Sequence, residues 1–233
     1  VELAKPRITL MVVITAAAGA YMAASADFSP LLLIGTLVAT AVLASAASAL
    51  NQVLESDSDA RMRRTARRPL AAGRLECGPV TSASVALSAV AVLYLAVWVN
   101  LLTALLGALT WAAYLFVYTP MKKRSPLSTW VGAVPGALPP LMGWAAASGS
   151  LNAEAWILFG ILFLWQIPHF LAIAWMYRDD YQEAGIRVLP VIDRQGVWTG
   201  ALMVLFVLAT LGVSLLPLRF GFGGTGYAVV AVA

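Results

Sequence analysis

Residues 30–70 read PLLLIGTLVATAVLASAASALNQVLESDSDARMRRTARRPL, and this stretch decides the fold. Its first part, 31–52, is an apolar run of the length that crosses a bilayer, since about 20 residues span the roughly 30 Å hydrocarbon core as a helix. Its second part changes abruptly to carboxylates and arginines. The stretch therefore predicts a transmembrane helix that ends in a charged segment at one membrane face.

The rest of the chain repeats the apolar part of this pattern. Further apolar blocks lie at 8–25, 80–98, 101–119, 128–147, 155–177, 197–216 and 224–233. Of all residues, 61% are hydrophobic and only 11% are charged, against about 25% charged in soluble domains. We therefore expect an all-α, polytopic transmembrane helical bundle in a lipid bilayer. The chain begins with Val and its last block is too short for a span, so we expect the single domain, 1–233, to be truncated at both ends.

The basic residues predict how the bundle is oriented. All Lys and Arg except Arg219 precede the first block or lie in alternate loops, which share one membrane side. The positive-inside rule makes that side cytoplasmic and explains each basic residue without a function. We expect a multi-pass protein of the bacterial plasma membrane, with a matrix-facing orientation in an organelle as the alternative. The acids contribute little to topology, yet all but Asp27 and Glu154 lie on this side too and require another explanation.

Three polar residues lie at helical spacing at the end of the block 31–52 and just beyond it. Asn51, Glu55 and Asp59 are four residues apart, which places them on one stripe of a helix. Unpaired carboxylates at a membrane edge are costly, and Mg²⁺ prefers a few carboxylates together with phosphate oxygens. The arginines of 61–68 can bind those oxygens. The pattern predicts a metal–diphosphate site, and the alternative is a solvated loop with internal salt bridges.

A second polar segment follows the block 155–177. Asp179 and Glu183 are again four residues apart, with Asp180 beside them, and this group could complete a second metal position. Pro168 is expected to kink or break the preceding helix. His169, the single histidine, is either a functional group or one half of a helix–helix hydrogen bond. Glycines and prolines in 128–147 predict an irregular helix, which either allows close packing or lines a cavity.

Four segments resemble one known family. LAKPRIT at 3–9, the acidic and basic run at 51–70, YTPMKKRSPLSTWVGAVPGALPPLMGW at 118–144 and WQIPHFLAIAWMYRDDYQEAGIRVLPV at 165–191 are similar to the UbiA-type intramembrane prenyltransferases, and within them to the protohaem IX farnesyltransferase branch. The resemblance covers nearly the whole chain in order. It implies nine spans and the transfer of a farnesyl group from farnesyl diphosphate to protohaem IX, which forms haem O with Mg²⁺ as cofactor.

The resemblance also implies roles for particular residues. The catalytic residues it implies are Asn51, Glu55, Asp59 and Asp180. The metal ligands it implies are Asn51, Glu55, Asp59, Asp179, Asp180 and Glu183. The substrate-binding residues it implies are Arg64, Arg68, Lys123, Arg124, His169, Tyr118 and Tyr181. Haem A synthase and oxidase assembly proteins are candidate partners, and nucleic acid is not expected to be one.

Two other functions are open at this point. An aromatic acceptor, such as a hydroxybenzoate in quinone synthesis, would use the same leaving-group chemistry. A transporter of phosphorylated or cationic solutes belongs to another class and would require polar residues along a path across the membrane. The charges instead gather at one face, which favours the enzyme.

Overall fold

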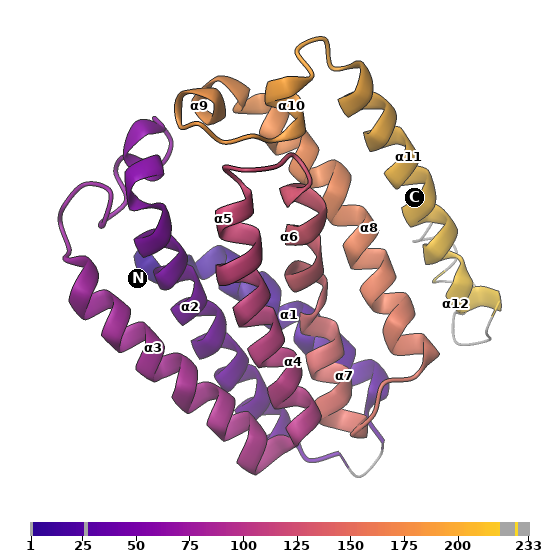
Figure 1. Cartoon of the computed structure of the whole chain (residues 1–233). Coiled ribbons are helices and arrows are strands. Elements are labelled where there is room, and N and C mark those ends of the chain that lie inside the picture. Colours follow the sequence, from indigo (N-terminus) through magenta and orange to yellow (C-terminus); the bar gives the residue numbers. More distant parts are fainter. Residues whose placement is uncertain (1, 26–27, 220–226, 228–233) are drawn as a thin grey trace.

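The computed structural model describes residues 2–25, 28–219 and 227, and these residues form helices and connecting segments without a β-strand among them (Figure 1). The elements that correspond to predicted spans are α1 (Pro6–Ala23), α2 (Pro30–Arg61), α3 with η2 (Cys77–Tyr94, Leu95–Val99), α4 with η3 and α5 (Leu101–Ala112, Ala113–Tyr118, Thr119–Met121), α6 with α7 (Ser128–Ala137, Pro139–Ser148), α8 (Ala153–Met176) and α11 with α12 (Val197–Ser214, Leu216–Arg219). The predicted block 224–233 lies outside the described residues except for Tyr227. The predicted all-α membrane bundle is confirmed.

Prolines act differently in two of these segments. Six helical segments of the described chain are long and apolar enough to cross a membrane, and α6 with α7 is not among them because it is divided at Leu138. Pro139 follows this division, since a proline has no N–H to donate and its ring displaces the carbonyl four residues back. The expected irregular helix is therefore present. By contrast, α8 continues through Pro168, so the alternative of a break there is wrong.

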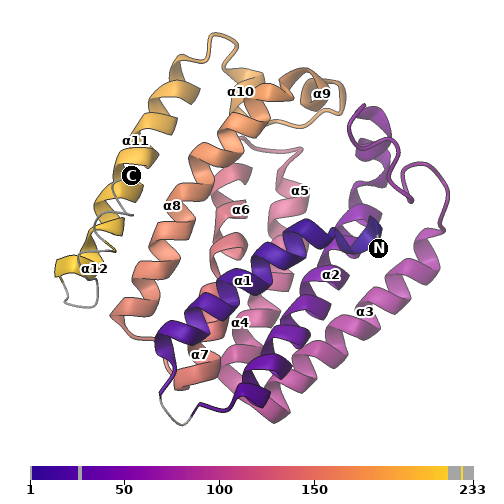
Figure 2. The ribbon, with the colours of Figure 1, turned by 180° about the vertical axis from the view of Figure 1, so that it is seen from behind.

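Close packing of α1 against α7 holds one face of the bundle together (Figure 2). Gly19 and Gly143 lie where the two helices meet, and a Cβ atom on either one would overlap with the backbone of the other helix, at Pro140 or Ala16 respectively. Glycine is required at both positions because the obstacle is backbone, which cannot rotate away. Such small residues are the usual device for helix association in lipid.

The outer surface is apolar. Val90, Leu93 and Val97 on α3 and η2, and Val204 and Leu208 on α11, each expose more than half of their surface. Large apolar side chains on the outside of a helical bundle are stable in hydrocarbon and unstable in water. The exposed surface thus agrees with the membrane location that the composition predicts.

Three connecting segments meet at one end of the bundle, called the charged end below (Figure 1). They are 62–76, 122–127 and the segment with the short helices α9 (Arg178–Glu183) and α10 (Leu189–Ile192). Met62 packs with Ile186 and Val188 in one buried apolar cluster, and the Arg187 N–H donates to the Lys122 carbonyl at 2.8 Å. The loops that were expected to share a membrane side are therefore in direct contact.

Candidate active site

A pocket lies at the charged end and is lined by residues of α2, η3, α8 and α9, among others. Its polar wall is built from four parts of the chain and includes Lys5, Asn51, Glu55, Asp59, Arg64, Arg68, Tyr114, Tyr118, Lys122 and Tyr181. Its other wall is largely apolar and includes Phe170, Ile173, Ala174, Ile186 and Val188. The site can accordingly hold a ligand with a charged head and an apolar body.

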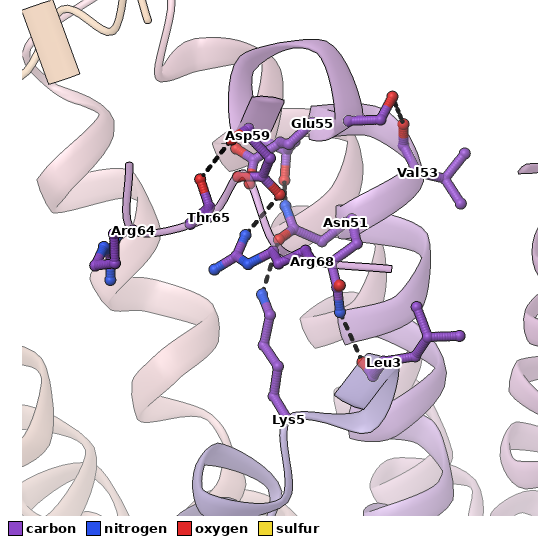
Figure 3. Close-up of polar contacts among 12 residues, drawn as sticks. Leu3, Lys5, Asn51, Val53, Glu55, Asp59, Arg64, Thr65 and Arg68 are labelled. Atoms are coloured by element: carbon purple, nitrogen blue, oxygen red, sulfur yellow. Dashed lines mark hydrogen bonds and ion pairs between the residues drawn. The ribbon is translucent and has the colours of Figure 1, made fainter. Parts of the chain in front are cut away.

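The polar stripe of α2 belongs to the polar wall of this pocket, and Figure 3 shows its contacts. Asn51 and Asp59 are each 1% exposed, and Glu55 is partly buried. Asp57 lies on another face of the helix and is exposed, as the 100° rotation per residue requires. The structure therefore brings together the three residues that the four-residue spacing singled out.

Each member of the stripe has a cationic partner. Arg68 Nη1 lies 2.6 Å from Asp59 Oδ2, and Lys122 Nζ lies 2.8 Å from Glu55 Oε1. Lys5 Nζ donates to Asn51 Oδ1 at 3.2 Å. Three cations thus face two carboxylates, and the surplus of positive charge favours an anionic ligand.

The amine of Lys5 has an unusually low pKa for a lysine. Burial, followed by repulsion from Arg68 and Lys122, lowers the pKa of Lys5 to about 8, although Glu55 and Asp59 act in the opposite direction. Lys5 is also the one described non-glycine residue with positive φ, at 44°. This backbone conformation is costly for a residue with a side chain, and it turns the chain at the start of α1 so that the amine reaches Asn51.

Arg64 links the segment after α2 to α9. Its Nη2 donates to the Tyr181 hydroxyl at 3.4 Å, and its guanidinium lies 4.9 Å from the centre of the Tyr177 ring. Desolvation raises the pKa of Tyr181, which keeps the hydroxyl protonated. Both Arg64 and Tyr181 line the pocket, as the resemblance implied for substrate-binding residues.

The second acidic group does not join the first. Asp179 exposes 91% of its side chain and pairs only loosely with Arg178 at 3.8 Å, and Glu183 is also exposed. Asp180 is partly buried and does not line the pocket. The cause is the helical geometry of α9, where Tyr181 faces the pocket and residues one or two positions away face elsewhere. Within the described residues, no three acidic, His or Cys side chains form a metal-binding cluster.

His169 also lies away from the pocket. It is exposed, and its ring stacks on Trp165 with centroids 4.9 Å apart and planes at 13°. The next residue, Phe170, lines the pocket instead. Consecutive residues of α8 point about 100° apart, so Phe170 lies in the pocket wall and His169 does not.

Of the 122–124 run, the resemblance implies Lys123 and Arg124 as substrate-binding residues, whereas Lys122 lines the pocket. Lys123 and Arg124 are exposed, whereas Lys122 enters the pocket, with Nζ 4.5 Å from the centre of the Tyr118 ring. The signal was present, because Tyr114, Tyr118 and Lys122 repeat the four-residue spacing of the acidic stripe. Lys5 was missed as well, and no helical spacing could have revealed it, since it reaches the site from a separate segment.

The oxygens of the stripe suit a hard divalent cation. Asp59 Oδ1 is buried and accepts no hydrogen bond from the residues that the structure describes, although a carboxylate oxygen has lone pairs free to accept one. An orphaned buried carboxylate oxygen is costly unless a ligand satisfies it. Together with Glu55 and the Asn51 amide oxygen it presents the ligand types that Mg²⁺ prefers when phosphate oxygens complete the shell.

Residues 12–233 match the UbiA prenyltransferase family. The chain is 45% identical to protohaem IX farnesyltransferase of Solibacter usitatus, with 100% of the chain and 82% of the relative covered. It is 43% identical to the protein of the same name in Koribacter versatilis, with 99% and 76% covered.

Solved structures share the fold. A digeranylgeranylglyceryl phosphate synthase superposes with a TM-score of 0.81 at 15% identity, covering 99% of the chain and 80% of that structure. A UbiA homologue from Archaeoglobus fulgidus bound to DMAPP and Mg²⁺ gives a TM-score of 0.74 at 17% identity, covering 99% and 81%. At these identities the likeness concerns the arrangement of helices.

Proposed function

Because the chain belongs to the UbiA prenyltransferase family, we propose that it transfers a farnesyl group from farnesyl diphosphate to a vinyl group of protohaem IX and so forms haem O. In this reaction the bond from farnesyl C1 to the diphosphate oxygen breaks and a carbon–carbon bond to the vinyl group forms. Water adds its oxygen to the remaining vinyl carbon and releases a proton, which leaves a hydroxyethylfarnesyl side chain. The observation that carries the proposal is the buried α2 stripe with its surplus of cations.

The cations of the pocket would bind the diphosphate. Lys5, Arg68 and Lys122 already converge on the stripe, and Arg64 lies at its edge. Negative charge develops on the diphosphate as its bond to carbon breaks, and donors fixed in advance stabilise that charge without having to reorganise. These side chains thereby favour the departure of the leaving group.

The three stripe residues would hold Mg²⁺, the cofactor that we propose for this site. When bound, Mg²⁺ neutralises charge on the diphosphate as a Lewis acid. Glu55 and Asp59 would then exchange Lys122 and Arg68 for the metal, which frees both cations for phosphate oxygens. The arrangement supports this role for Asn51, Glu55 and Asp59, and offers no such support for Asp179, Asp180 and Glu183.

The apolar wall would receive the farnesyl chain and the acceptor. Tyr114 and Tyr118 stack with ring centroids 5.7 Å apart, and both line the pocket together with its cationic side chains. Aromatic faces attract positive charge, so they suit an allylic carbon that gains cationic character as the diphosphate leaves. Phe170 and Ile173 lie in the apolar wall and would keep water away from this carbon until the vinyl group reaches it.

We further propose that the charged end faces the cytoplasm of a bacterial plasma membrane. The exposed cations Arg61, Arg63, Arg67 and Lys123 lie at this end and do not line the pocket. Basic residues next to membrane spans favour the cytoplasmic side. Labelling of single cysteines introduced at Arg63 and Ser150, in intact cells, tests the orientation through their opposite accessibility.

The activity is tested with the purified protein in lipid nanodiscs. We expect mass spectrometry to detect a hydroxyethylfarnesyl haem after incubation with protohaem IX, farnesyl diphosphate and Mg²⁺. A parallel incubation replaces haem by 4-hydroxybenzoate and tests the aromatic acceptor. A farnesylated benzoate with unmodified haem would overturn the proposal.

A further inference from the structure

The amide of Asn51 is held at both ends. Its Oδ1 accepts from Lys5 Nζ at 3.2 Å, and its Nδ2 donates to Thr119 Oγ1 at 3.0 Å. We infer that Thr119 is a positioning residue, whose hydroxyl fixes the Asn51 amide so that its oxygen, and not its nitrogen, faces the pocket.

The number of hydrogen atoms on the Thr119 hydroxyl decides which way the Asn51 amide can be oriented. This group has one hydrogen, which it donates to the Tyr114 carbonyl at 2.8 Å. Only lone pairs then remain on the side that faces Asn51. A flipped amide would set its oxygen against these lone pairs and its NH₂ against the Lys5 ammonium, so both hydrogen bonds would be lost.

The position of the Tyr114 carbonyl follows from the local sequence. The segment η3, Ala113–Tyr118, is a π-helix, and the Thr119 N–H also bonds to the Tyr114 carbonyl five residues back. Pro120 cannot donate to the carbonyl four residues before it and its ring crowds that turn, which disturbs the α-helical register at this point. Single π turns of this kind are often found at functional sites. Here the turn aims one carbonyl at the Thr119 hydroxyl.

Burial makes the arrangement rigid. Thr119 is 6% exposed and Asn51 is 1% exposed. No other hydrogen bond from the described side chains reaches the amide of Asn51. Without the Thr119 acceptor, the amide would have no partner for its nitrogen in this orientation, and a rotated amide would turn that nitrogen toward the pocket.

The consequence concerns metal binding and rests on the proposed function. An amide oxygen is a ligand for Mg²⁺ and an amide nitrogen is not. Loss of a group that orients a metal ligand typically weakens metal affinity 10- to 100-fold. Thr119→Val preserves shape but removes the acceptor, so we expect Mn²⁺, used as a spectroscopic substitute for Mg²⁺, to bind about tenfold more weakly. Thr119→Ser keeps the hydroxyl and should restore the affinity.

The test measures Mn²⁺ binding by electron paramagnetic resonance with the full chain in nanodiscs and unhydrolysed farnesyl thiodiphosphate present. Asn51→Asp supplies a second background, because a carboxylate has an oxygen at either end and cannot be misoriented. In the protein that keeps Asn51, Thr119→Val should weaken Mn²⁺ binding about tenfold. In the Asn51→Asp background, the same change should weaken it by less than about twofold.

Each outcome decides one proposal. Equal affinities of the wild type and Thr119→Val overturn the positioning role, and so does an equal loss in both backgrounds, since that pattern indicates packing. If Thr119→Val does not fold, the comparison moves to Thr119→Ser and Thr119→Ala, and a loss in the Ser variant as large as in the Ala variant overturns the role. Absence of Mn²⁺ binding to the wild type instead contradicts the metal site of the proposed function.

Discussion

Lys122 and Glu55 form an ion pair of 2.8 Å deep in the pocket, with side-chain exposures of 18% and 12%. The pair joins the segment after α5 to α2. The next residue in the sequence after Lys122 is also a lysine, Lys123, and it is exposed at the surface. Two adjacent lysines therefore allow a matched test of which position serves the reaction.

Lys122→Met should lower kcat/KM for farnesyl diphosphate by about 100-fold or more, because it removes a fixed donor from a site of developing negative charge. Lys123→Met should stay within about twofold, since exposed charges contribute little. The initial rate of haem O formation measures both. Since Lys122→Met also leaves Glu55 partly buried without a partner, size-exclusion profiles establish that each variant folds. Equal losses in the two variants would contradict the site.

Asp59→Asn should remove most of the Mg²⁺-dependent turnover, with a loss of about 100-fold or more in kcat. The change removes one carboxylate oxygen and the charge that holds Arg68 at 2.6 Å. Asp57→Asn is the control, because Asp57 is exposed on another face of α2, and its rate should change by less than about threefold. Titration of the rate with Mg²⁺ separates the two variants, and a normal Mg²⁺ response of Asp59→Asn would remove Asp59 from the metal site.

The affinity for a prenyl diphosphate should fall as the pH rises above about 8. The pKa of Lys5 is lowered to about 8 in the ligand-free protein, and a bound anion raises it by favouring the charged amine. Binding above pH 8 therefore takes up a proton, and the Kd rises by up to about tenfold per pH unit. Calorimetry with farnesyl thiodiphosphate between pH 7 and about 9.5 measures this slope.

Lys5→Arg is the control for this pH dependence. Arginine remains protonated throughout the same range, so the slope that belongs to Lys5 should disappear in the variant. A slope of the same size in both proteins would assign the titration to another group.

His169→Ala should leave haem O formation within about threefold of the wild type, because the imidazole is exposed and stacks on Trp165. Phe170→Ala, one residue further, should reduce the rate by about tenfold or more, since it opens the apolar wall beside the reacting carbon. The KM for haem, measured for both, tests the acceptor role that the sequence assigned to His169. A raised KM in His169→Ala alone would restore that role.

Gly143→Ala should destabilise the bundle by about 1–3 kcal/mol, because the new methyl group meets the Ala16 backbone of α1. Gly212→Ala in α11 is the matched control, since no heavy atom lies within 4 Å of the added carbon, and helix propensity favours alanine. Thermal unfolding in detergent should show a lower Tm only for Gly143→Ala. Equal Tm values would argue against a tight contact between α1 and α7.

Length and periodicity were enough to predict six spans of the described chain and the α2 stripe. Both depend on local geometry, since an apolar run of bilayer length and a four-residue repeat each follow from one helix alone. Asn51, Glu55 and Asp59 accordingly line one pocket, as their spacing indicated.

The remaining site residues depend on contacts between segments that are far apart in the sequence. Whether Lys122 or Lys123 faces the pocket depends on how far the π-helix η3 rotates the residues that follow it. A run of three basic residues does not reveal this rotation. Lys5 reaches Asn51 across 46 positions of sequence. For Asp179, neighbouring acids suggested a metal site, whereas the orientation of α9 turns that side chain toward solvent.

The glycine contact between α1 and α7 has a consequence for the opposite end of α1. An α-helix behaves as a rigid rod with a rise of about 1.5 Å per residue, so Gly19 and Lys5 are separated by roughly 21 Å along the axis. A tilt of α1 by about 3° around the glycines would therefore displace the Lys5 backbone by about 1 Å. Helix tilt responds to the thickness of the surrounding bilayer. The thickness of the surrounding bilayer would thus act on the position of the Lys5 amine at the other end of the helix.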